Sequence, residues 1–233
     1  LGPCEGVRCA DTGELIPPEL VKAGREKEIA ELKAFGVFEF IRGQDGLGFK
    51  QVRCRWVDRL NKGACRSRFV AMEFANSIRD DLYAGTPLLG VVRLLISEAA
   101  THPKGKAPTK ILSAADISCA FMHAKYDGDL VLQLPEGMCP PGVRAKLVGA
   151  INGTRKASQL WQRFVEARMT EGGFLATKGC PQLYVHPRRG VWSVVHGDDF
   201  LVEAEAQQFP WVDEMLHRTI TYVPCLLYTS PSP

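Results

Sequence analysis

The stretch from Val191 to Ala204, VWSVVHGDDFLVEA, consists of two apolar runs separated by a Gly and two adjacent Asp. Two strand-like runs around so short a polar link are typical of a β-hairpin, and a hairpin commits this part of the chain to an antiparallel sheet. Taken alone, the two carboxylates need do no more than make the turn. A chemical role for them requires further donors from elsewhere in the chain.

The rest of the chain mixes helical and strand patterns. The predicted elements are helices over residues 17–34, 86–100 and 158–171, a hairpin over 49–72, and short strands over 111–116 and 129–134. Thr86 before Pro87 is a helix-start signal, and the helix that follows is apolar enough to belong to the core. Several links between strands are too short for parallel crossovers. We therefore expect an α+β domain with a largely antiparallel sheet.

Composition places the chain among ordinary globular proteins. It has 233 residues, of which 45% are hydrophobic and 24% charged, with a formal net charge of +3. Attraction for nucleic acid must therefore come from local clusters of Lys and Arg. The eight Cys lack metal-ligand spacing and suggest reduced thiols inside a cell, in cytoplasm or nucleus. Arg93 interrupts the longest apolar run, so we expect no membrane partner.

Asp116 changes the interpretation of the Asp pair. It ends the apolar run ILSAAD and is followed by small and apolar residues, where a carboxylate is costly unless it is paired or binds a cation. Two-metal phosphoryl transfer needs carboxylates that converge from separate segments. A strand-end Asp and a hairpin-tip pair supply that set, and Gly197 permits the tight turn that aims Asp198 and Asp199.

Five stretches then occur in an order typical of one family: AADISCAFMHA (114–124), LQLPEGM (132–138), AINGTRKASQLWQRF (150–164), KGCPQLYV (178–185) and VVHGDDFLV (194–202). Upstream stand GVFEFI, RCRWVDRLNKG and RSRFVAMEF, within residues 36–74. Together these motifs resemble the reverse transcriptases of copia-type (Ty/copia) LTR retrotransposons. Single motifs are weak evidence, whereas five or more in register over about residues 30–204 are specific.

The resemblance implies a fold and a set of catalytic residues. The fold would be the fingers and palm of a reverse transcriptase, with the catalytic Asp pair on a β-hairpin. Asp116 matches the family's first catalytic aspartate, and Asp198 and Asp199 match the pair. These three, with the backbone carbonyl of Ile117, would hold two Mg²⁺ ions, or Mn²⁺ in their place. The reaction would be nucleotidyl transfer from a dNTP to a primer 3′-hydroxyl.

The resemblance also implies binding residues. The nucleotide would contact Arg66, Arg68, Phe121, Arg155 and Lys156, with Phe121 lying under the incoming sugar. The template and primer, RNA or DNA, would contact the basic face of the predicted hairpin through Arg53, Arg55 and Lys62. Trp161 is expected in the core. Protease, integrase and RNase H segments of a polyprotein are the expected partners in the family.

Several positions depart from the family pattern. The family has Gln and Pro at the positions that Lys156 and Ser158 occupy in this chain. It has Lys and Gly in place of Met72 and Glu73, and Tyr and Val in place of His196 and Gly197. The carboxylates are retained while the residues that position the nucleotide are altered. Metal binding is therefore expected to be better preserved than efficient synthesis.

The expected organisation is an N-terminal extension over residues 1–30 and the fingers and palm domain over 31–204. The start of a truncated following segment occupies 205–224, and a tail outside the fold occupies 225–233. A thumb is expected to be absent, so the chain would be a fragment. Two other functions remain open: a non-catalytic nucleic-acid-binding remnant of such an element, and an unrelated Mg²⁺-dependent phosphohydrolase. Ser118 counts against the latter, because its DxD motif requires Asp there.

Overall fold

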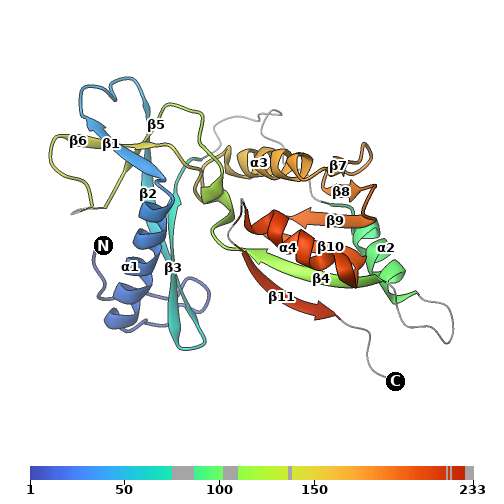
Figure 1. The fold of residues 1–233 in the computed structure, drawn as a ribbon. Helices are drawn as coiled ribbons and strands as arrows, with labels where there is room; N and C mark the ends of the chain where they lie inside the picture. The colour runs from blue at the N-terminus through green and yellow to red at the C-terminus, as the bar shows by residue number, and fades with distance from the viewer. Residues whose placement is uncertain (75–86, 102–109, 136–137, 219, 221, 229–233) are drawn as a thin grey trace. The chain divides into compact units, whose positions relative to one another are not determined.

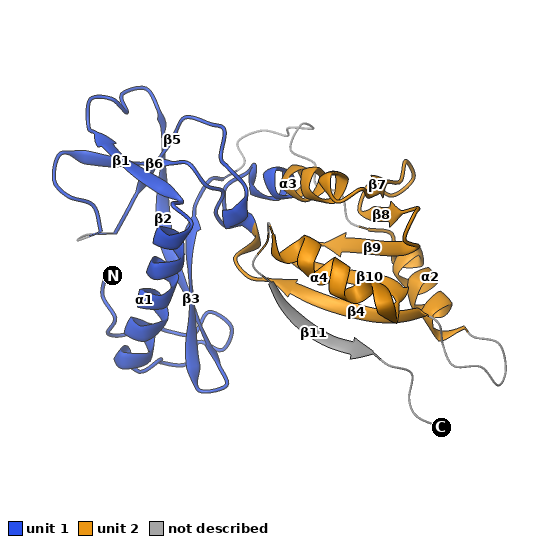
Figure 2. Cartoon of the chain, viewed as in Figure 1, with its two compact units in different colours: residues 1–82, 121–161 blue, residues 83–120, 162–233 orange. Residues whose placement is uncertain are grey.

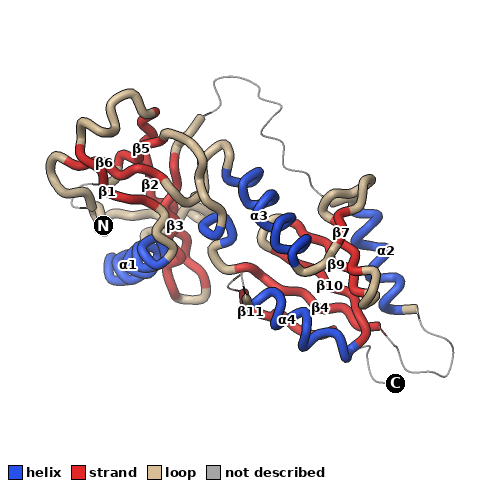
Figure 3. Tube along the Cα trace, turned by 45° about the horizontal axis from the view of Figure 1, so that its top comes forward, coloured by secondary structure: helices blue, strands red, loops and turns tan. Residues whose placement is uncertain are grey.

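The computed structural model describes residues 1–74, 87–101, 110–135, 138–218, 220 and 222–228 (Figure 1). The chain forms two compact units, one of residues 1–82 and 121–161 and the other of residues 83–120 and 162–233 (Figure 2). We call them unit 1 and unit 2. Both contain helices and strands, as the colouring of Figure 3 shows. The predicted mixed α+β class is therefore confirmed.

Unit 1 holds a five-stranded sheet in the order β1-β6-β5-β2-β3. The strands are β1 (Phe38–Arg42), β2 (Lys50–Asn61), β3 (Ala64–Ala71), β5 (Leu130–Gln133) and β6 (Val143–Leu147). Only β2 and β5 run parallel among these neighbours. β2 and β3 form the predicted hairpin. Its turn residues Lys62 and Gly63 have φ of 49° and 79°, as a type I′ turn requires.

Helix α1 (Pro18–Ala34) covers the free edge of β3. Gly24 allows the close approach, because a Cβ there would lie 2.4 Å from the carbonyl oxygen of Cys65. The buried carboxylate of Glu28 accepts the backbone N–H of Phe69 at 3.0 Å and Nη1 of Arg68 at 2.6 Å. Burial raises the pKa of Glu28, while the Phe69 N–H and the Arg68 charge oppose that rise.

The N-terminal segment belongs to unit 1 and is not a separate extension. Nη1 of Arg25, on α1, donates to the carbonyls of Leu1 and Pro3 at 3.0 and 2.8 Å. The N–H of Ala10 donates to the carbonyl of Asp58 on β2 at 2.9 Å. The expected boundary at residue 30 therefore falls inside α1 and differs from the structure. It differs because buried polar contacts, which composition does not reveal, hold the segment in place.

Unit 2 holds a six-stranded, fully antiparallel sheet in the order β11-β4-β10-β9-β8-β7. The strands are β4 (Lys110–Ile117), β7 (Leu175–Ala176), β8 (Leu183–His186), β9 (Val191–His196), β10 (Asp199–Glu205) and β11 (Tyr222–Tyr228). The α-helices are α2 (Leu89–Ala100), α3 (Ala157–Glu171), which begins in unit 1, and α4 (Phe209–His217). Short 3₁₀ turns cover Ala120–His123 and Ala206–Gln208.

The two faces of this sheet are covered differently. Cross-strand partners share a face, so Leu201 of β10 and Val194 of β9 point the same way. Leu95 of α2 packs in a cluster with Val194 and Leu201. On the opposite face, Trp211 of α4 contacts the ring of His186 of β8, with centroids 5.0 Å apart. Helices α2 and α4 therefore lie on opposite faces of the sheet.

Two expectations about this unit need correction. The apolar helix begins at Leu89, and the predicted cap Thr86 lies outside the described residues. Leu95 is its buried residue, while Leu89 and Leu94 are exposed, because only one side of the helix meets the sheet. The expected end of the fold at residue 224 also differs, since β11 pairs with β4 as far as Tyr228. No helix among the described residues is long and apolar enough to cross a membrane.

Candidate active site

The tip of the β9–β10 hairpin is a two-residue turn made by Gly197 and Asp198. Gly197 has φ of +62°, and Asp198 is not among the residues with positive φ. A left-handed Gly followed by a residue with negative φ is the pattern of a type II′ turn, which matches the twist of the two strands. The hairpin predicted from the sequence is therefore confirmed, with its turn one residue shorter than the run of Gly and two Asp.

The turn places Asp199 as the first residue of β10, in register with residues on both neighbouring strands. Its partner on β4 is Asp116, and its partner on β9 is His196. The N–H of Ile117 donates to the carbonyl of Asp198 at 2.8 Å, which ties the hairpin tip to the end of β4. Since cross-strand partners share a face, Asp116 and Asp199 point to the same side of the sheet. The structure thus brings together the four predicted site residues of unit 2.

Partial burial and mutual repulsion both act on the carboxylates of this group. Partial burial of its carboxyl raises the pKa of Asp199, and the negative charges of Asp198 and Asp116 raise it further. The charge of His196 opposes the rise. Like charges directly opposite each other destabilise a sheet. A bound cation would relieve that repulsion, so the arrangement is suited to a divalent ion.

The donors fit magnesium in chemistry, because Mg²⁺ prefers carboxylate oxygens. Asp116, Asp198 and Asp199 are exposed, so an ion could reach them from solvent. In the described part of the chain, no three His, Cys, Asp or Glu side chains are grouped closely enough to hold a metal ion. Substrate oxygens or a change of Asp rotamers would have to complete the coordination.

The acids lie on the same face of the sheet as α2. Asp199 and Leu201 are two residues apart on β10 and so point the same way, and Leu201 packs in the cluster below α2. The helix covers the middle of the face, whereas Asp116 and Asp199 at the strand ends stay exposed. The acidic end of this face is therefore exposed to solvent, whereas its apolar middle is covered by α2.

The two predicted triphosphate-binding arginines differ in their surroundings. Both belong to β3 of unit 1. Arg66 is exposed and lies opposite Arg59 across the hairpin. Arg68 is bound to the buried Glu28 at 2.6 Å, with Glu31 at 3.7 Å. Arg68 therefore has a structural role at the edge of the sheet that the sequence did not indicate.

The remaining predicted nucleotide contacts also lie in unit 1. Phe121 is half-buried in the 3₁₀ turn Ala120–His123. The N–H of Arg155 donates to Oε2 of Glu73 at 2.8 Å. Lys156 forms an ion pair with Asp127 at 2.9 Å. Lys156 and the backbone of Arg155 are thus held by local acidic side chains just before α3.

The predicted nucleic-acid contacts form one surface. Arg53 and Arg55 alternate along β2 and share a face with Arg59 and with Arg66 of β3. All four are exposed, as is Lys62 at the hairpin turn. We call this surface, made by Arg53, Arg55, Arg59, Lys62 and Arg66, the basic face. The positive charge of the basic face is a local cluster, since the formal net charge of the whole chain is only +3.

Sequence reasoning missed the position of His196. It treated His196 as a departure from a family pattern, whereas the structure pairs it directly with Asp199. The two-residue turn contained that information, because such a turn always pairs the residue before it with the residue after it. Glu28 and Glu73, which hold Arg68 and the Arg155 backbone, carry no local sequence pattern that would have revealed their roles.

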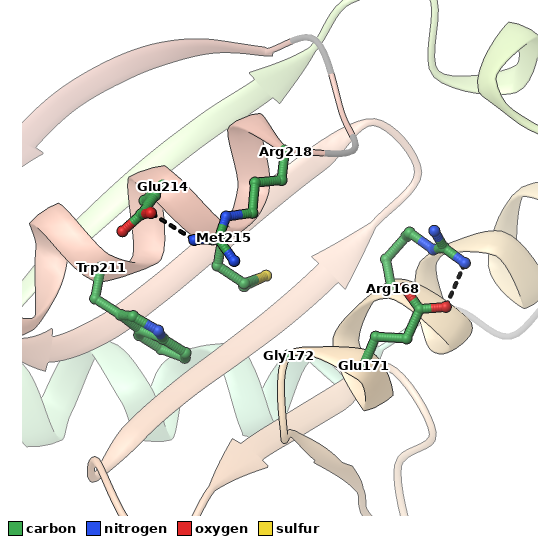
Figure 4. A pocket seen from close by; sticks show the side chains of 7 residues that line it. All are labelled: Arg168, Glu171, Gly172, Trp211, Glu214, Met215 and Arg218. Carbon is green, nitrogen blue, oxygen red and sulfur yellow. Dashed lines mark hydrogen bonds and ion pairs between the residues drawn. The ribbon is translucent and has the colours of Figure 1, made fainter.

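A pocket of about 290 Å³ lies elsewhere in unit 2, between the end of α3 and α4 (Figure 4). Its lining residues are Arg168, Glu171, Gly172, Trp211, Glu214, Met215 and Arg218. Its charged side chains pair with each other, Arg168 with Glu171 and Arg218 with Glu214. None of the predicted site residues lines it. The acids lie on the α2 face, so this pocket is separate from them.

We expect Gly197→Ala to destabilise unit 2 by about 1–2 kcal/mol, because a left-handed φ penalises any residue with a Cβ. The space around Gly197 is open, so strain of the turn is the only cost. Urea unfolding of the two chains measures it. Gly90→Ala, at an open position without positive φ in α2, is the control and should be neutral or stabilising. An unchanged midpoint for Gly197→Ala would contradict the assigned turn.

Comparison with known proteins gives distant similarities in sequence and in structure. No family model matches the chain. It is 23% identical over 178 residues to the retrovirus-related Pol polyprotein from transposon TNT 1-94 of Nicotiana tabacum, covering 71% of this chain. It spans only 13% of that polyprotein.

The second similarity is structural. A telomerase from Candida albicans, solved with a TWJ fragment of telomeric RNA, superimposes with a TM-score of 0.51 and 9% identity. The match covers 97% of this chain and 49% of the telomerase chain. At this identity the likeness concerns the fold alone.

Proposed function

We propose that this chain is the fingers and palm part of a reverse transcriptase from a copia-type retroelement. The observation that carries the proposal is the register of Asp116 against Asp199, with Asp198 at the adjoining turn tied to Ile117. Segments far apart in the sequence thereby supply carboxylates to one point on one sheet face. The distant similarities to a retrotransposon polyprotein and to a telomerase support the same class.

In the proposed reaction a primer 3′-hydroxyl attacks the α-phosphate of a dNTP. Asp116, Asp198, Asp199 and the carbonyl of Ile117 would hold two Mg²⁺ ions, which when bound supply activation of the attacking oxygen and stabilisation of phosphate charge. The protein's own contribution is to fix these donors on two paired strands. Arg66 would neutralise triphosphate charge, and the basic face would contact template and primer backbones.

Primer extension tests the proposal. The chain is incubated with poly(rA)/oligo(dT), dTTP and Mg²⁺ or Mn²⁺, and elongated products are resolved by length. Elongation that requires the metal supports the assignment. A folded chain that shows no elongation with either metal would contradict synthesis by this protein.

A second candidate, nucleic-acid binding without turnover, is favoured by one specific observation. Arg68 and Lys156, predicted to contact the nucleotide, are both held in ion pairs with Glu28 and Asp127. The basic face stays exposed at the same time. A chain that binds primer and template but does not extend the primer would establish this candidate over the first.

We expect the double variant Arg53→Ala, Arg55→Ala to weaken binding to single-stranded and duplex nucleic acid. Each arginine that neutralises a phosphate adds about 0.9 to the slope of log affinity against log salt, so the slope should fall by about 2. Fluorescence anisotropy at several salt concentrations measures it. Arg188→Ala, an exposed arginine of unit 2, is the control and should leave the slope unchanged. Equal effects of the two variants would remove the basic face as the binding surface.

A further inference from the structure

Strand β1 is the end strand of the sheet in unit 1, and within the described part of the chain no strand pairs with its outer edge. It has the sequence FEFIR, of which Glu39, Phe40 and Arg42 are exposed. Phe40 is 50% exposed although its ring is apolar, and it contacts the ring of Phe38 with centroids 5.7 Å apart. Edge strands of this kind are the places where a sheet can extend from one chain into another.

The hydrogen bonds at the two ends of β1 fix which of its backbone groups point outward. The carbonyl of Val37 accepts the N–H of Val148 at 2.9 Å, and the N–H of Gly43 donates to the carbonyl of Gly142 at 3.0 Å. Bonded and non-bonded residues alternate along an antiparallel strand, so the odd-numbered residues of β1 bond to β6. The even-numbered residues therefore direct their N–H and carbonyl groups to the outer edge: Phe38, Phe40 and Arg42.

These outward groups are available to another strand. The carbonyl of Arg42 accepts the N–H of Asp45 at 3.0 Å, which uses one of its two lone pairs. Among the described residues, none bonds to the outward N–H and carbonyl groups of Phe38 or Phe40. The outer edge of β1 thus presents backbone donors and acceptors in the alternating order that a further antiparallel strand requires.

The backbone of β1 is complementary to a second copy of itself. In an antiparallel pair centred on Phe40, this residue lies opposite Phe40 of the second copy, and Phe38 lies opposite Arg42. Even-numbered residues then meet even-numbered residues, and each such pair can exchange two hydrogen bonds. A register shifted by two residues would lose one of these pairs. The register centred on Phe40 therefore uses the outward groups most fully.

The side chains favour the same register. Phe38, Phe40 and Arg42 share one face of the strand, because they alternate along it. The two Phe40 rings would meet on the twofold axis, and each Arg42 guanidinium would lie over Phe38 of the other copy as a cation–π contact. On the opposite face Glu39 would lie across from Ile41, so no like charges would oppose each other. A cation at one end of the strand and an aromatic ring at the other select a second copy as the partner.

We propose that the chain forms a dimer in which β1 of one copy pairs antiparallel with β1 of the second. The same strand serves both copies, so the contact is isologous and closes after two chains. The pairing would join the two five-stranded sheets into one continuous sheet. A contact made by so short a strand is small, so the association should be reversible and depend on protein concentration. The inference stands on unit 1 alone and does not depend on the proposed polymerase function.

Analytical ultracentrifugation of the whole chain, without nucleic acid, tests the association. The mass of the unaltered chain should rise from that of a monomer toward twice that value as the protein concentration increases. Phe40→Glu would place two carboxylates opposite each other and should weaken association by roughly tenfold or more. Phe40→Lys should weaken it in the same way through two ammonium groups. An equimolar mixture of the two variants should associate again, because opposite charges then meet across the axis.

Leu89→Glu is the matched control. Leu89 lies on α2 in unit 2 and is 61% exposed, so the substitution also replaces an exposed apolar side chain with a charge. It should leave the association unchanged.

Amide hydrogen exchange of the unaltered chain tests the register residue by residue. The N–H groups of Glu39 and Ile41 bond to β6 and should exchange slowly at every protein concentration. Those of Phe38, Phe40 and Arg42 should become protected only at concentrations where the mass doubles. This measurement needs no substitution, so it still applies if a change at residue 40 impairs folding.

Four results would overturn the proposal. The first is a chain that stays monomeric at every concentration, and the second is a mass that grows beyond that of a dimer. Loss of association in Leu89→Glu but not in Phe40→Glu would place the contact on α2. A mixture of Phe40→Glu and Phe40→Lys that stays monomeric would show that the two copies do not face each other at residue 40.

Discussion

Replacing Asp199 by Asn is expected to abolish primer extension and at the same time to make unit 2 more stable. Loss of a carboxylate that acts together with two others costs about 10³-fold or more in rate. The stability gain follows from the raised pKa of Asp199, because partial burial of its carboxyl and the negative charges of Asp198 and Asp116 disfavour its charged form. Extension rates and thermal midpoints of the two chains measure both effects.

The pH dependence of the gain has a definite sign. A raised folded-state pKa means that the fold loses stability as pH rises through that value and Asp199 becomes charged. The Asn variant should therefore exceed the unaltered chain in stability at neutral pH, and the difference should vanish in acid, where both side chains are neutral. A variant that is less stable at neutral pH would contradict the repulsion described for the site.

A matched control separates the site from general charge effects. Glu205 lies on the same strand and the same face as Asp199, is exposed, and takes no part in the carboxylate group. Glu205→Gln removes the same charge and should leave primer extension unchanged. If both variants lose extension equally, Asp199 has no special part in the reaction.

Replacing Arg25 by Ala is expected to destabilise unit 1 by about 3–5 kcal/mol, because it leaves a buried carboxylate without its counter-charge. Arg25 and Asp58 are each 4% exposed, and Nη2 and Nε of Arg25 donate to the two carboxylate oxygens at 2.7 and 3.3 Å. Ser67 adds a hydrogen bond to Asp58 at 2.6 Å. Equilibrium unfolding in urea, followed by tryptophan fluorescence, measures the loss.

The neighbouring ion pair of β2 provides the control. Arg59 pairs with Asp11 at 3.2 Å, but the two side chains are 56% and 58% exposed. Exposed pairs are worth less than about 1 kcal/mol, so Arg59→Ala should change the unfolding midpoint little. Comparable losses of stability in the two variants would mean that burial does not determine how much the Arg25–Asp58 pair contributes to the free energy of unfolding.

Local patterns predicted the elements of the site well. The alternation in VWSVVH and DFLVEA, with Gly197 between them, is enough to place a hairpin, and the structure has it at Val191–His196 and Asp199–Glu205. Helical spacing likewise located α3. These features depend on residues close in sequence, so the physical reasons for them lie within a single segment.

Pairing between distant segments could not be derived from those patterns. Alternation shows that β4 and β10 are strands but does not select one as the partner of the other. The convergence of Asp116 with the Asp pair was predicted from the chemistry of a metal site, whereas the register of Asp116 with Asp199 became known only from the structure. The role of Arg68 was missed for a similar reason. Its partner Glu28 lies on α1, and nothing near Arg68 in the sequence shows that this helix covers β3.

The contact of Glu28 with Phe69 also bears on self-association. β3 is the last strand of its sheet. The unpaired N–H groups of such an edge strand would ordinarily donate hydrogen bonds to a strand of another molecule. The Glu28 carboxylate already holds the N–H of Phe69 and is itself neutralised by Arg68. An incoming strand would have to break a buried ion pair before gaining one hydrogen bond. The contact of Glu28 therefore disfavours pairing of β3 with a strand of a second chain.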